Sequence, residues 1–324
     1  MGEPRRAIEF YEQALVINRE IGDRRGEGIV LGNLGIAYYH LGEPRRAIEF
    51  HEQALVINRE IGNHRGEGAA LGNLGLAYFN LSEPRRAIEF HEQNLVITRE
   101  IGDRRDEGNA LGNLGIAYAD LGEPRRAIEF YEQQLKIARE IGDRRGEGTA
   151  LCNCGLAYYS LGEPRRAIEF YEQTLEITRA IGDRHGEGYA LGNLGPAYVA
   201  VGEPRRAIDF YEQRLVIARE SGDRRGEGNA LGNLGVAYKN LGEPRRAIEF
   251  YEQVLVITRE IGDRRGEGNA LWNMSLAQDK LGEREQAIAN AEAALKIYEQ
   301  IEDPNAAQVR RQLEEWRGQK SGKQ

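Results

Sequence analysis

Seven asparagines stand forty residues apart in this sequence of 324 residues, and their side chains are the first candidates for a binding chemistry. They are Asn33, Asn73, Asn113, Asn153, Asn193, Asn233 and Asn273. A carboxamide both donates and accepts hydrogen bonds, so it can pair with a peptide bond of any sequence. Asparagine is a mediocre helix former, so its return at one position asks for a reason. We expect this asparagine ladder to bind the main chain of a ligand, or else to form hydrogen bonds between neighbouring helices.

Side chains that could catalyse a reaction or bind a metal do not form a recognisable set in this sequence. His51 and His91 share a repeat position otherwise filled by tyrosine, so we expect them to be core residues. His40, His64 and His185 are scattered, and none has ligand spacing to another histidine, a cysteine or a carboxylate. Cys152 and Cys154 would point to nearly opposite sides of a helix, so they cannot bridge each other or share a metal. No phosphate-binding loop, nucleophile elbow or dinucleotide-binding glycine pattern occurs. We therefore expect no enzyme, no cofactor and no metal site.

The asparagines belong to a longer repeated pattern. Residues 31–38 read LGNLGIAY and residues 47–55 read AIEFHEQAL, and close copies of both return every forty residues without an insertion. A fixed period of this size indicates a stacked array in which each unit buries its apolar face against its neighbours. Gly42 suits the left-handed position after a helix, and Pro44 suits the first turn of the next one. Each repeat is therefore predicted to hold two helices, at about residues 27–41 and 44–61 in the first repeat.

The predicted fold class is all-α, an α-solenoid of antiparallel helix pairs. Seven pairs begin near residues 27, 67, 107, 147, 187, 227 and 267, and the array extends over residues 1–303. Residues 3–21 match only the second helix of a pair. Either the chain is cut from a longer protein there, or this helix is an N-terminal cap; we favour the cut, because Ile8, Tyr11 and Leu15 would face a missing neighbour. Residues 304–317 are predicted to form a capping helix with an apolar stripe through Trp316, and residues 318–324 a disordered tail.

The residue pattern of the repeat resembles that of tetratricopeptide repeats. Leu31-x-x-Leu34-Gly35-x-x-Tyr38, followed by Ala47, matches their pattern, with leucine for the usual tryptophan and histidine or tyrosine for a later phenylalanine. The period is forty residues instead of thirty-four. In this respect the chain is similar to Pins-type G-protein-signalling modulators, kinesin light chains and bacterial signalling proteins. The resemblance implies a right-handed superhelix whose first helices line a concave groove, where an asparagine at the matching position holds a peptide backbone.

The side of each first helix that carries the asparagine is predicted to be the binding surface. At 3.6 residues per turn, Leu31, Leu34 and Tyr38 fall in one sector, and positions 29, 32, 33, 36, 39 and 40 lie opposite. We call these six positions of every repeat the groove face. Positions 29 and 39 differ most between repeats, so this face is either unconstrained or tuned to a ligand. Besides the asparagine ladder, the expected binding residues are Tyr39, Phe79, Asn109, Tyr159, Tyr189, Asn229, Lys239, Asn269 and Trp272.

Two further positions bear on the shape of this groove. Glycine occupies position 32 in five repeats, where it would admit a ligand backbone or a neighbouring helix closely. Cys152 and Trp272 replace it, so we expect the groove to be narrower near its end. Position 54 of the second helix also varies and could reach the groove, as Asn94, Gln134, Thr174, Arg214 and Val254. Positions 29, 32, 33 and 36 carry no lysine or arginine, which argues against the carboxylate clamp of some family members.

Composition narrows the class of partner. The net charge of −8 argues against a nucleic-acid binder, which needs a clustered basic face. No apolar run approaches the roughly 20 residues of a membrane span, and two cysteines fit a reducing, cytoplasmic setting. We expect a scaffold that binds an extended peptide or a partner helix of another protein. The alternatives are a structural array that associates with itself through residues 3–21, and a regulatory segment of a larger signalling protein.

Overall fold

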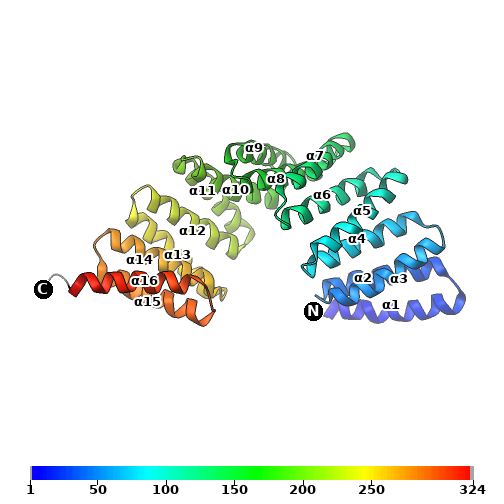
Figure 1. Ribbon diagram of the computed structural model, residues 1–324, viewed down its shortest axis with the longest axis horizontal. Helices are drawn as coiled ribbons and strands as arrows, with labels where there is room; N and C mark the ends of the chain where they lie inside the picture. The colour runs from blue at the N-terminus through cyan, green and yellow to red at the C-terminus, as the bar shows by residue number, and fades with distance from the viewer. Residues whose placement is uncertain (1, 322–324) are drawn as a thin grey trace. The chain divides into compact units, whose positions relative to one another are not determined.

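The computed structural model describes residues 2–321, with side chains described for residues 5–318, and every regular element in this part of the chain is an α-helix (Figure 1). The helices are α1 Gly2–Ile21, α2 Arg24–His40, α3 Pro44–Glu60, α4 His64–Asn80, α5 Pro84–Glu100, α6 Arg104–Asp120, α7 Pro124–Ile141, α8 Arg144–Ser160, α9 Pro164–Ala180, α10 Arg184–Ala200, α11 Pro204–Ser221, α12 Arg224–Asn240, α13 Pro244–Glu260, α14 Arg264–Lys280, α15 Arg284–Gln300 and α16 Asn305–Ser321. The even-numbered helices α2 to α14 are the first helices of the seven repeats. The prediction of an all-α solenoid of helix pairs is confirmed.

The helix ends follow from a few residues that recur. Asp23 caps α2, and its carboxylate accepts a hydrogen bond from the backbone N–H of Gly26 at 2.9 Å. The first helix therefore begins at Arg24. The prediction places its start three residues later, because the glycines near this point suggest a loop. Gly42 has a φ of 76°, which a side chain would strain, and Pro44 opens α3 as predicted.

The C-terminal helix is longer than predicted. It begins at Asn305 and continues to Ser321, so the described part of the expected tail is helical. Val309, Leu313 and Trp316 are buried along one side of it, as the apolar stripe indicates. Residues 322–324 lie outside the described residues.

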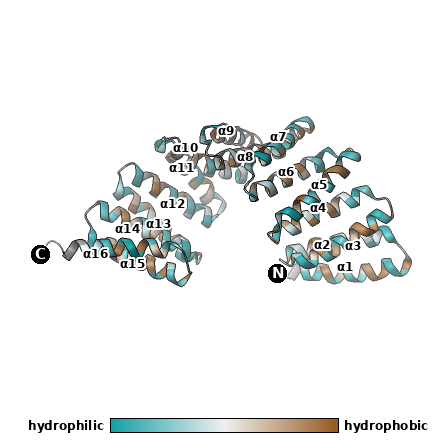
Figure 2. Ribbon diagram, viewed as in Figure 1, coloured by the Kyte–Doolittle hydropathy of each residue, from teal (hydrophilic) through white to brown (hydrophobic). Residues whose placement is uncertain are grey.

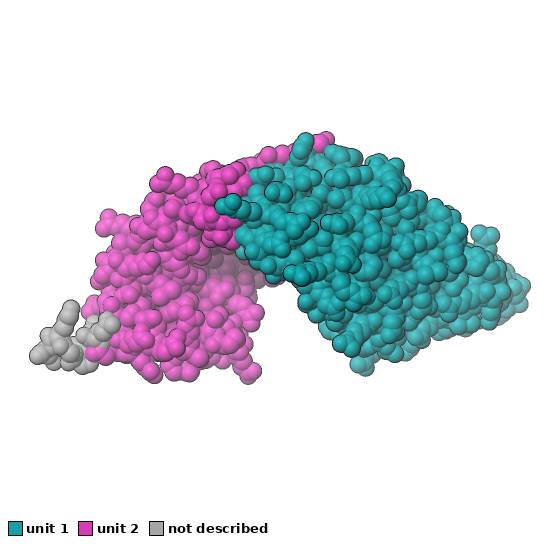
Figure 3. Space-filling model, turned by 45° about the horizontal axis from the view of Figure 1, so that its top comes forward, with its two compact units in different colours: residues 1–177 teal, residues 178–324 magenta. Residues whose placement is uncertain are grey.

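The chain divides into two compact units, residues 1–177 and residues 178–324 (Figure 3). Within each unit, consecutive helices pack against each other, and first helices also contact the first helices of neighbouring repeats. Leu31 and Leu34 are completely buried, and so are their counterparts in the following repeat, Leu71 and Leu74. Figure 2 shows hydrophobic and hydrophilic residues interspersed along the helices, as expected where each helix buries one side. The core is therefore a series of thin apolar layers.

A close contact between glycine and an aromatic ring fixes the distance between the two helices of a repeat. A methyl group on Gly35 would lie 2.5 Å from the imidazole of His51, and one on Gly155 would lie 2.5 Å from the phenol ring of Tyr171. At such distances the ring must shift to admit any side chain larger than hydrogen. The same glycine faces a histidine or tyrosine in six of the repeats. The prediction that His51 and His91 are core residues in the place of tyrosine is confirmed, since both are 1% exposed.

A buried glutamate joins each repeat to the one before it. Glu27 of α2 is 5% exposed and accepts a hydrogen bond from Arg19 of α1 at 2.7 Å and one from Arg24 at 2.6 Å. The hydrogen bond from Arg19 lowers the pKa of Glu27 most, against the effect of burial. Corresponding arginine–glutamate pairs, at 2.7–2.9 Å, recur at Arg59–Glu67, Arg99–Glu107, Arg139–Glu147, Arg179–Glu187, Arg219–Glu227 and Arg259–Glu267. We call this contact the glutamate clasp.

Candidate functional site

The asparagine ladder lies half-buried along the groove face. All seven ladder asparagines have intermediate exposure, whereas the seven residues at position 29 are exposed. Within the described residues, no ladder asparagine forms a hydrogen bond with another. Asn193 and Asn273 each donate to a backbone carbonyl of their own helix, at 3.0 Å in both cases. The carboxamide oxygen of Asn273 accepts a hydrogen bond from the ammonium group of Lys239, at 2.9 Å, which joins α14 to α12.

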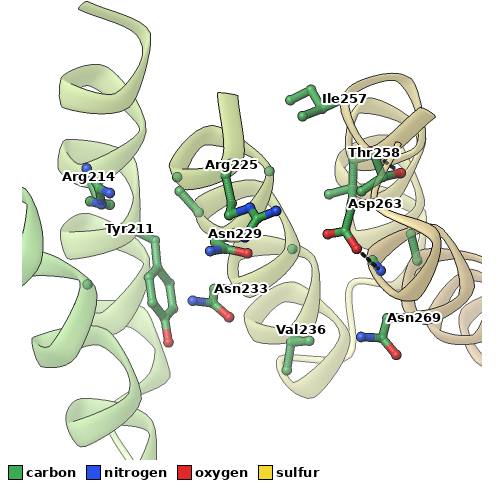
Figure 4. Close-up of a pocket in the computed structure, with 18 of the residues that line it drawn as sticks. Tyr211, Arg214, Arg225, Asn229, Asn233, Val236, Ile257, Thr258, Asp263 and Asn269 are labelled. Atoms are coloured by element: carbon green, nitrogen blue, oxygen red, sulfur yellow. Dashed lines mark hydrogen bonds between the residues drawn. The ribbon is translucent and has the colours of Figure 1, made fainter. Parts of the chain in front are cut away.

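One hollow on this face lies within the second unit, between the first helices α10, α12 and α14 (Figure 4). Its volume is about 470 Å³, within the usual range for ligand pockets. It brings together six of the residues expected to bind a partner: Tyr189, Asn193, Asn229, Asn233, Asn269 and Asn273. We call this hollow the asparagine cavity.

Glycine at position 32 leaves part of this cavity open. An added methyl group at Gly192 would meet no atom within 4 Å, and one at Gly232 would meet only Val254, at 4.0 Å. By contrast, a methyl group at Gly112 would lie 2.7 Å from the side chain of Gln134. Position 32 therefore serves packing in some repeats, while in the fifth and sixth it keeps space on the groove face.

The floor of the asparagine cavity comes from the second helices α11 and α13. Arg214 at position 54 reaches it, as predicted for this position, and its guanidinium pairs with Asp223 at 2.9 Å. The pKa of Asp223 is lowered, mainly by the hydrogen bond from the backbone N–H of Gly226, with a further contribution from Arg214. Tyr251 is 1% exposed, and its hydroxyl has no hydrogen-bond partner. Burial raises the pKa of this hydroxyl, which is therefore a neutral donor and acceptor.

Sequence reasoning misses Arg225 and Tyr251. Arg225 lies in the first turn of α12, which the glycines suggest to be a loop, and Figure 4 shows its side chain beside Asn229 in the cavity. The repeat pattern assigns Tyr251 to the core alone. The sequence does hold a signal for Arg225, because Asp223 is a helix-capping residue and places Arg225 in the first turn of the helix.

The binding residues expected in the first unit do not line the asparagine cavity. Tyr39 and Phe79 are half-buried and pack against the apolar core, while Tyr159 is 39% exposed. Asn109 is exposed and donates a hydrogen bond to Asp106 at 3.2 Å. A smaller hollow of about 210 Å³ lies between α2 and α4. It is lined by Ile36, Tyr39, His40, His51, Asn73 and Leu76.

Trp272 is not accessible on the groove face, contrary to the prediction. It is 8% exposed, and its ring lies 6.3 Å from that of Trp316 in α16. The sixteenth helix thus covers the indole, which belongs to the C-terminal core. The same repeat has Ala294 at position 54, where Arg214 and Val254 stand in the two repeats before it. A small residue there leaves room for a large one at position 32, a relation between two helices that inspection of one helix does not reveal.

The fold and this surface define the class of protein: a solenoid of paired helices with a variable face on the first helix of each pair. The family model for the tetratricopeptide repeat matches residues 1–60, 27–100, 66–140, 106–180, 147–220, 188–260 and 226–300. The chain therefore belongs to the tetratricopeptide repeat family, as the wording of the repeat indicates. A search of curated proteins finds no match.

Solved structures of similar fold come from several organisms. BtubC (BKLC) from P. vanneervenii is 20% identical, with a TM-score of 0.62 over 68% of this chain and 93% of that one. The apo quorum sensor NprR from B. thuringiensis is 16% identical, with a TM-score of 0.65 over 90% and 83%. Aspartyl phosphate phosphatase F from Bacillus subtilis is 14% identical, with a TM-score of 0.64 over 97% and 94%. At these identities the likeness concerns the fold.

Three observations concern metal binding, membrane spans and the two cysteines. Among the described residues, no cluster of three or more histidine, cysteine or acidic side chains could hold a metal ion. None of the helices in the same residues is long and apolar enough to cross a membrane. Cys152 and Cys154 are both buried and form no disulfide, and burial raises the pKa of the Cys154 thiol to about 12.

Proposed function

We propose that this chain is a protein-interaction module that binds an extended peptide segment of a partner across the groove face. The observation that carries the proposal is the asparagine cavity, where carboxamides from three successive first helices line one hollow. An extended peptide presents N–H and C=O groups at regular intervals, and carboxamides can pair with both. The name quorum sensor, borne by a structure of similar fold, is consistent with the binding of signals by such arrays.

The cavity offers more than one kind of contact for such a peptide. Gly192 and Gly232 give its backbone close access to α10 and α12. Tyr189 and Asn229 are exposed at the rim, and the unpaired hydroxyl of Tyr251 lies in the floor. Side chains at the variable positions would then select the sequence of the peptide, while the asparagines bind its main chain.

The test begins with peptides selected from a random displayed library, with the full chain as bait. A variant in which Asn193, Asn233 and Asn273 are all changed to alanine should lose about 100-fold in affinity, because each hydrogen bond contributes about 1 kcal/mol. Gln253→Ala is the matched control, since this exposed carboxamide lies on the second helix α13, outside the groove face and the cavity. Unchanged affinity in the triple variant would refute the proposal. Loss of helicity would show instead that the ladder is structural.

A second candidate function is self-association through α1. Ile17 is 55% exposed, whereas its counterpart in the first repeat, Ile57, is 4% exposed. Phe10 and Ile21 add to this apolar face, being 58% and 69% exposed. A second copy of the chain could cover it. Sedimentation velocity over a range of concentrations should then show dimers that Ile17→Glu abolishes, and a strict monomer at high concentration would exclude this function.

A further inference from the structure

The small hollow of the first unit exists at a position where the sequence changes from tyrosine to histidine. Residue 51 and its counterparts are His51, His91, Tyr131, Tyr171, Tyr211 and Tyr251. All six are nearly fully buried, and each ring lies against the glycine at position 35 of its repeat. In the second unit, the phenols of Tyr211 and Tyr251 reach the asparagine cavity. An imidazole in the same slot is shorter, so it leaves the outer part of the slot unfilled.

In the first repeat this unfilled space is the hollow of about 210 Å³ between α2 and α4. Ile36, Tyr39 and Leu76 form apolar walls, and His40 and the carboxamide of Asn73 also line the hollow. Ile36 and Leu76 are 41% and 37% exposed, so a ligand on this face can contact their side chains. The hollow thus combines apolar walls on the groove face with a ladder asparagine at its edge.

The imidazole of His51 adds a buried polar group to this hollow. His51 is 1% exposed, and its Nδ1 has no hydrogen-bond partner. Burial lowers the pKa of His51 to about 4, so the ring is neutral at neutral pH and carries one donor and one acceptor nitrogen. A buried polar atom without a partner is unfavourable, and a ligand that satisfies it gains affinity. Such a ligand needs an apolar body and a polar end.

The hydroxyl is the group that satisfies this nitrogen best. It both donates and accepts, so it can pair with Nδ1 in either tautomer of the imidazole. A benzyl group would fill the hollow but leave Nδ1 unpaired, and a charged group would lose its hydration between apolar walls. A phenol combines the apolar ring with the hydroxyl. The later repeats show that this slot accepts a phenol, because they fill it with one of their own.

We propose that the hollow between α2 and α4 is a pocket for a tyrosine side chain of the bound peptide, with the tyrosine hydroxyl on Nδ1 of His51. The carboxamide of Asn73 pairs with the main chain beside that tyrosine. The inference rests on the proposed function for the peptide, but the pocket itself can be tested with a side-chain analogue. It adds a sequence preference that the asparagines cannot give, because they bind any main chain.

A residue that later repeats carry at position 51 can be used to fill the pocket. His51→Tyr introduces the residue that four later repeats carry at this position. The fourth repeat holds Tyr159 at position 39 together with Tyr171, so the two aromatic residues are compatible. His51→Tyr should therefore fold normally and occupy the pocket. His91→Tyr makes the same change one repeat later and serves as the matched control.

The experiment uses p-cresol, which is the side chain of tyrosine, and toluene, which is that of phenylalanine. The ring nitrogens of the histidines in the full chain are followed by long-range ¹H–¹⁵N NMR during titration. We expect p-cresol to shift Nδ1 of His51 saturably and to bind about tenfold more tightly than toluene, as one hydrogen bond allows. His51→Tyr should abolish this binding without lowering the melting temperature, and His91→Tyr should retain it.

Two results would overturn the pocket: equal affinities for p-cresol and toluene, or unchanged p-cresol binding in His51→Tyr. Since p-cresol has no main chain, these results do not depend on the asparagines, and they stand whether or not a peptide is found. For peptides selected on the full chain, the proposal expects a tyrosine whose replacement by phenylalanine weakens binding about tenfold. Selected peptides that bind the groove face and show no such preference would refute the assignment to a peptide tyrosine.

Discussion

Gly192→Ala separates the binding of a ligand from the stability of the fold. Gly192 lies inside α10, where alanine is favoured over glycine by about 1 kcal/mol. The added methyl group meets no atom of the protein within 4 Å, so nothing opposes this gain. The variant should therefore be more stable by about 1 kcal/mol, which corresponds to a rise of roughly 2–4 °C in the melting temperature of a domain of this size. The same methyl group enters the space left for a peptide backbone and should weaken binding at least tenfold.

Gly195→Ala, three residues later on α10, provides the contrast. Its methyl group would overlap the ring of Tyr211, so the packing between α10 and α11 must shift. Overpacking of this kind costs about 1–3 kcal/mol, more than the gain in helix propensity. The melting temperature should fall, whereas Gly192→Ala raises it, and peptide binding should also change because the displaced ring of Tyr211 lines the cavity. Thermal melts followed by circular dichroism give the first quantity, and fluorescence anisotropy with a selected peptide gives the second.

The reasoning fails if Gly192→Ala is less stable than the unmodified chain, because the space beside Gly192 is then filled in solution. It also fails if Gly192→Ala binds the selected peptide with unchanged affinity, since the ligand then does not approach α10. A more stable protein that binds less tightly is the expected combination, and misfolding cannot produce it. This makes the variant more informative than the removal of a binding side chain.

Three other predictions concern stability and its dependence on pH. Glu147→Gln should destabilise the fold by about 1–3 kcal/mol in urea melts, because the glutamate clasp with Arg139 loses its charged acceptor. The same change at the exposed Glu129 should alter the free energy of unfolding by no more than about 0.5 kcal/mol. Equal effects at the two positions would show that the glutamate clasp is not the cause. Replacement of both His51 and His91 by tyrosine should reduce acid sensitivity. Burial lowers the pKa of both imidazoles to about 4, so protonation of the unfolded chain removes up to about 3 kcal/mol of stability per histidine as the pH falls from about 6.5 to about 4. If urea midpoints of the double variant keep the slope of the unmodified chain over this range, the histidines are not responsible. Trp272→Ala should lower the free energy of unfolding by about 3–5 kcal/mol, because α16 loses a packing partner. The affinity for a selected peptide should stay within about threefold, and a large loss of affinity would show that Trp272 contacts the peptide.

Much of the fold could be predicted because recurring residues mark where the helices of each repeat begin and end. Gly42 and Pro44 mark a turn by backbone conformation alone, and their recurrence every forty residues makes the assignment firm. The predicted start of α2 is three residues late, since Asp23 resembles part of a loop in the sequence although it caps the helix. Helix propensity, read residue by residue, does not show whether the favourable effect of a capping residue exceeds the unfavourable effect of two nearby glycines.

The site was less predictable, because it depends on distances between helices. The groove face could be derived from the helical period, and six of its expected residues do meet in one cavity. The burial of Trp272 beneath α16 and the position of Arg225 in the cavity are relations between separate elements. The glutamate clasp escapes prediction for the same reason, since Arg19 and Glu27 lie on different helices. Each of these contacts requires knowledge of which helix faces which.

The glutamate clasp has a consequence for how such a chain can change in length. Every clasp has the same chemistry and nearly the same geometry, so the end of any of the first six repeats fits the beginning of any repeat. A recombination event between clasps that adds or removes forty residues in frame would rebuild an intact junction. The array can therefore gain or lose whole repeats, with the order of the groove-face residues rearranged and the scaffold left unchanged.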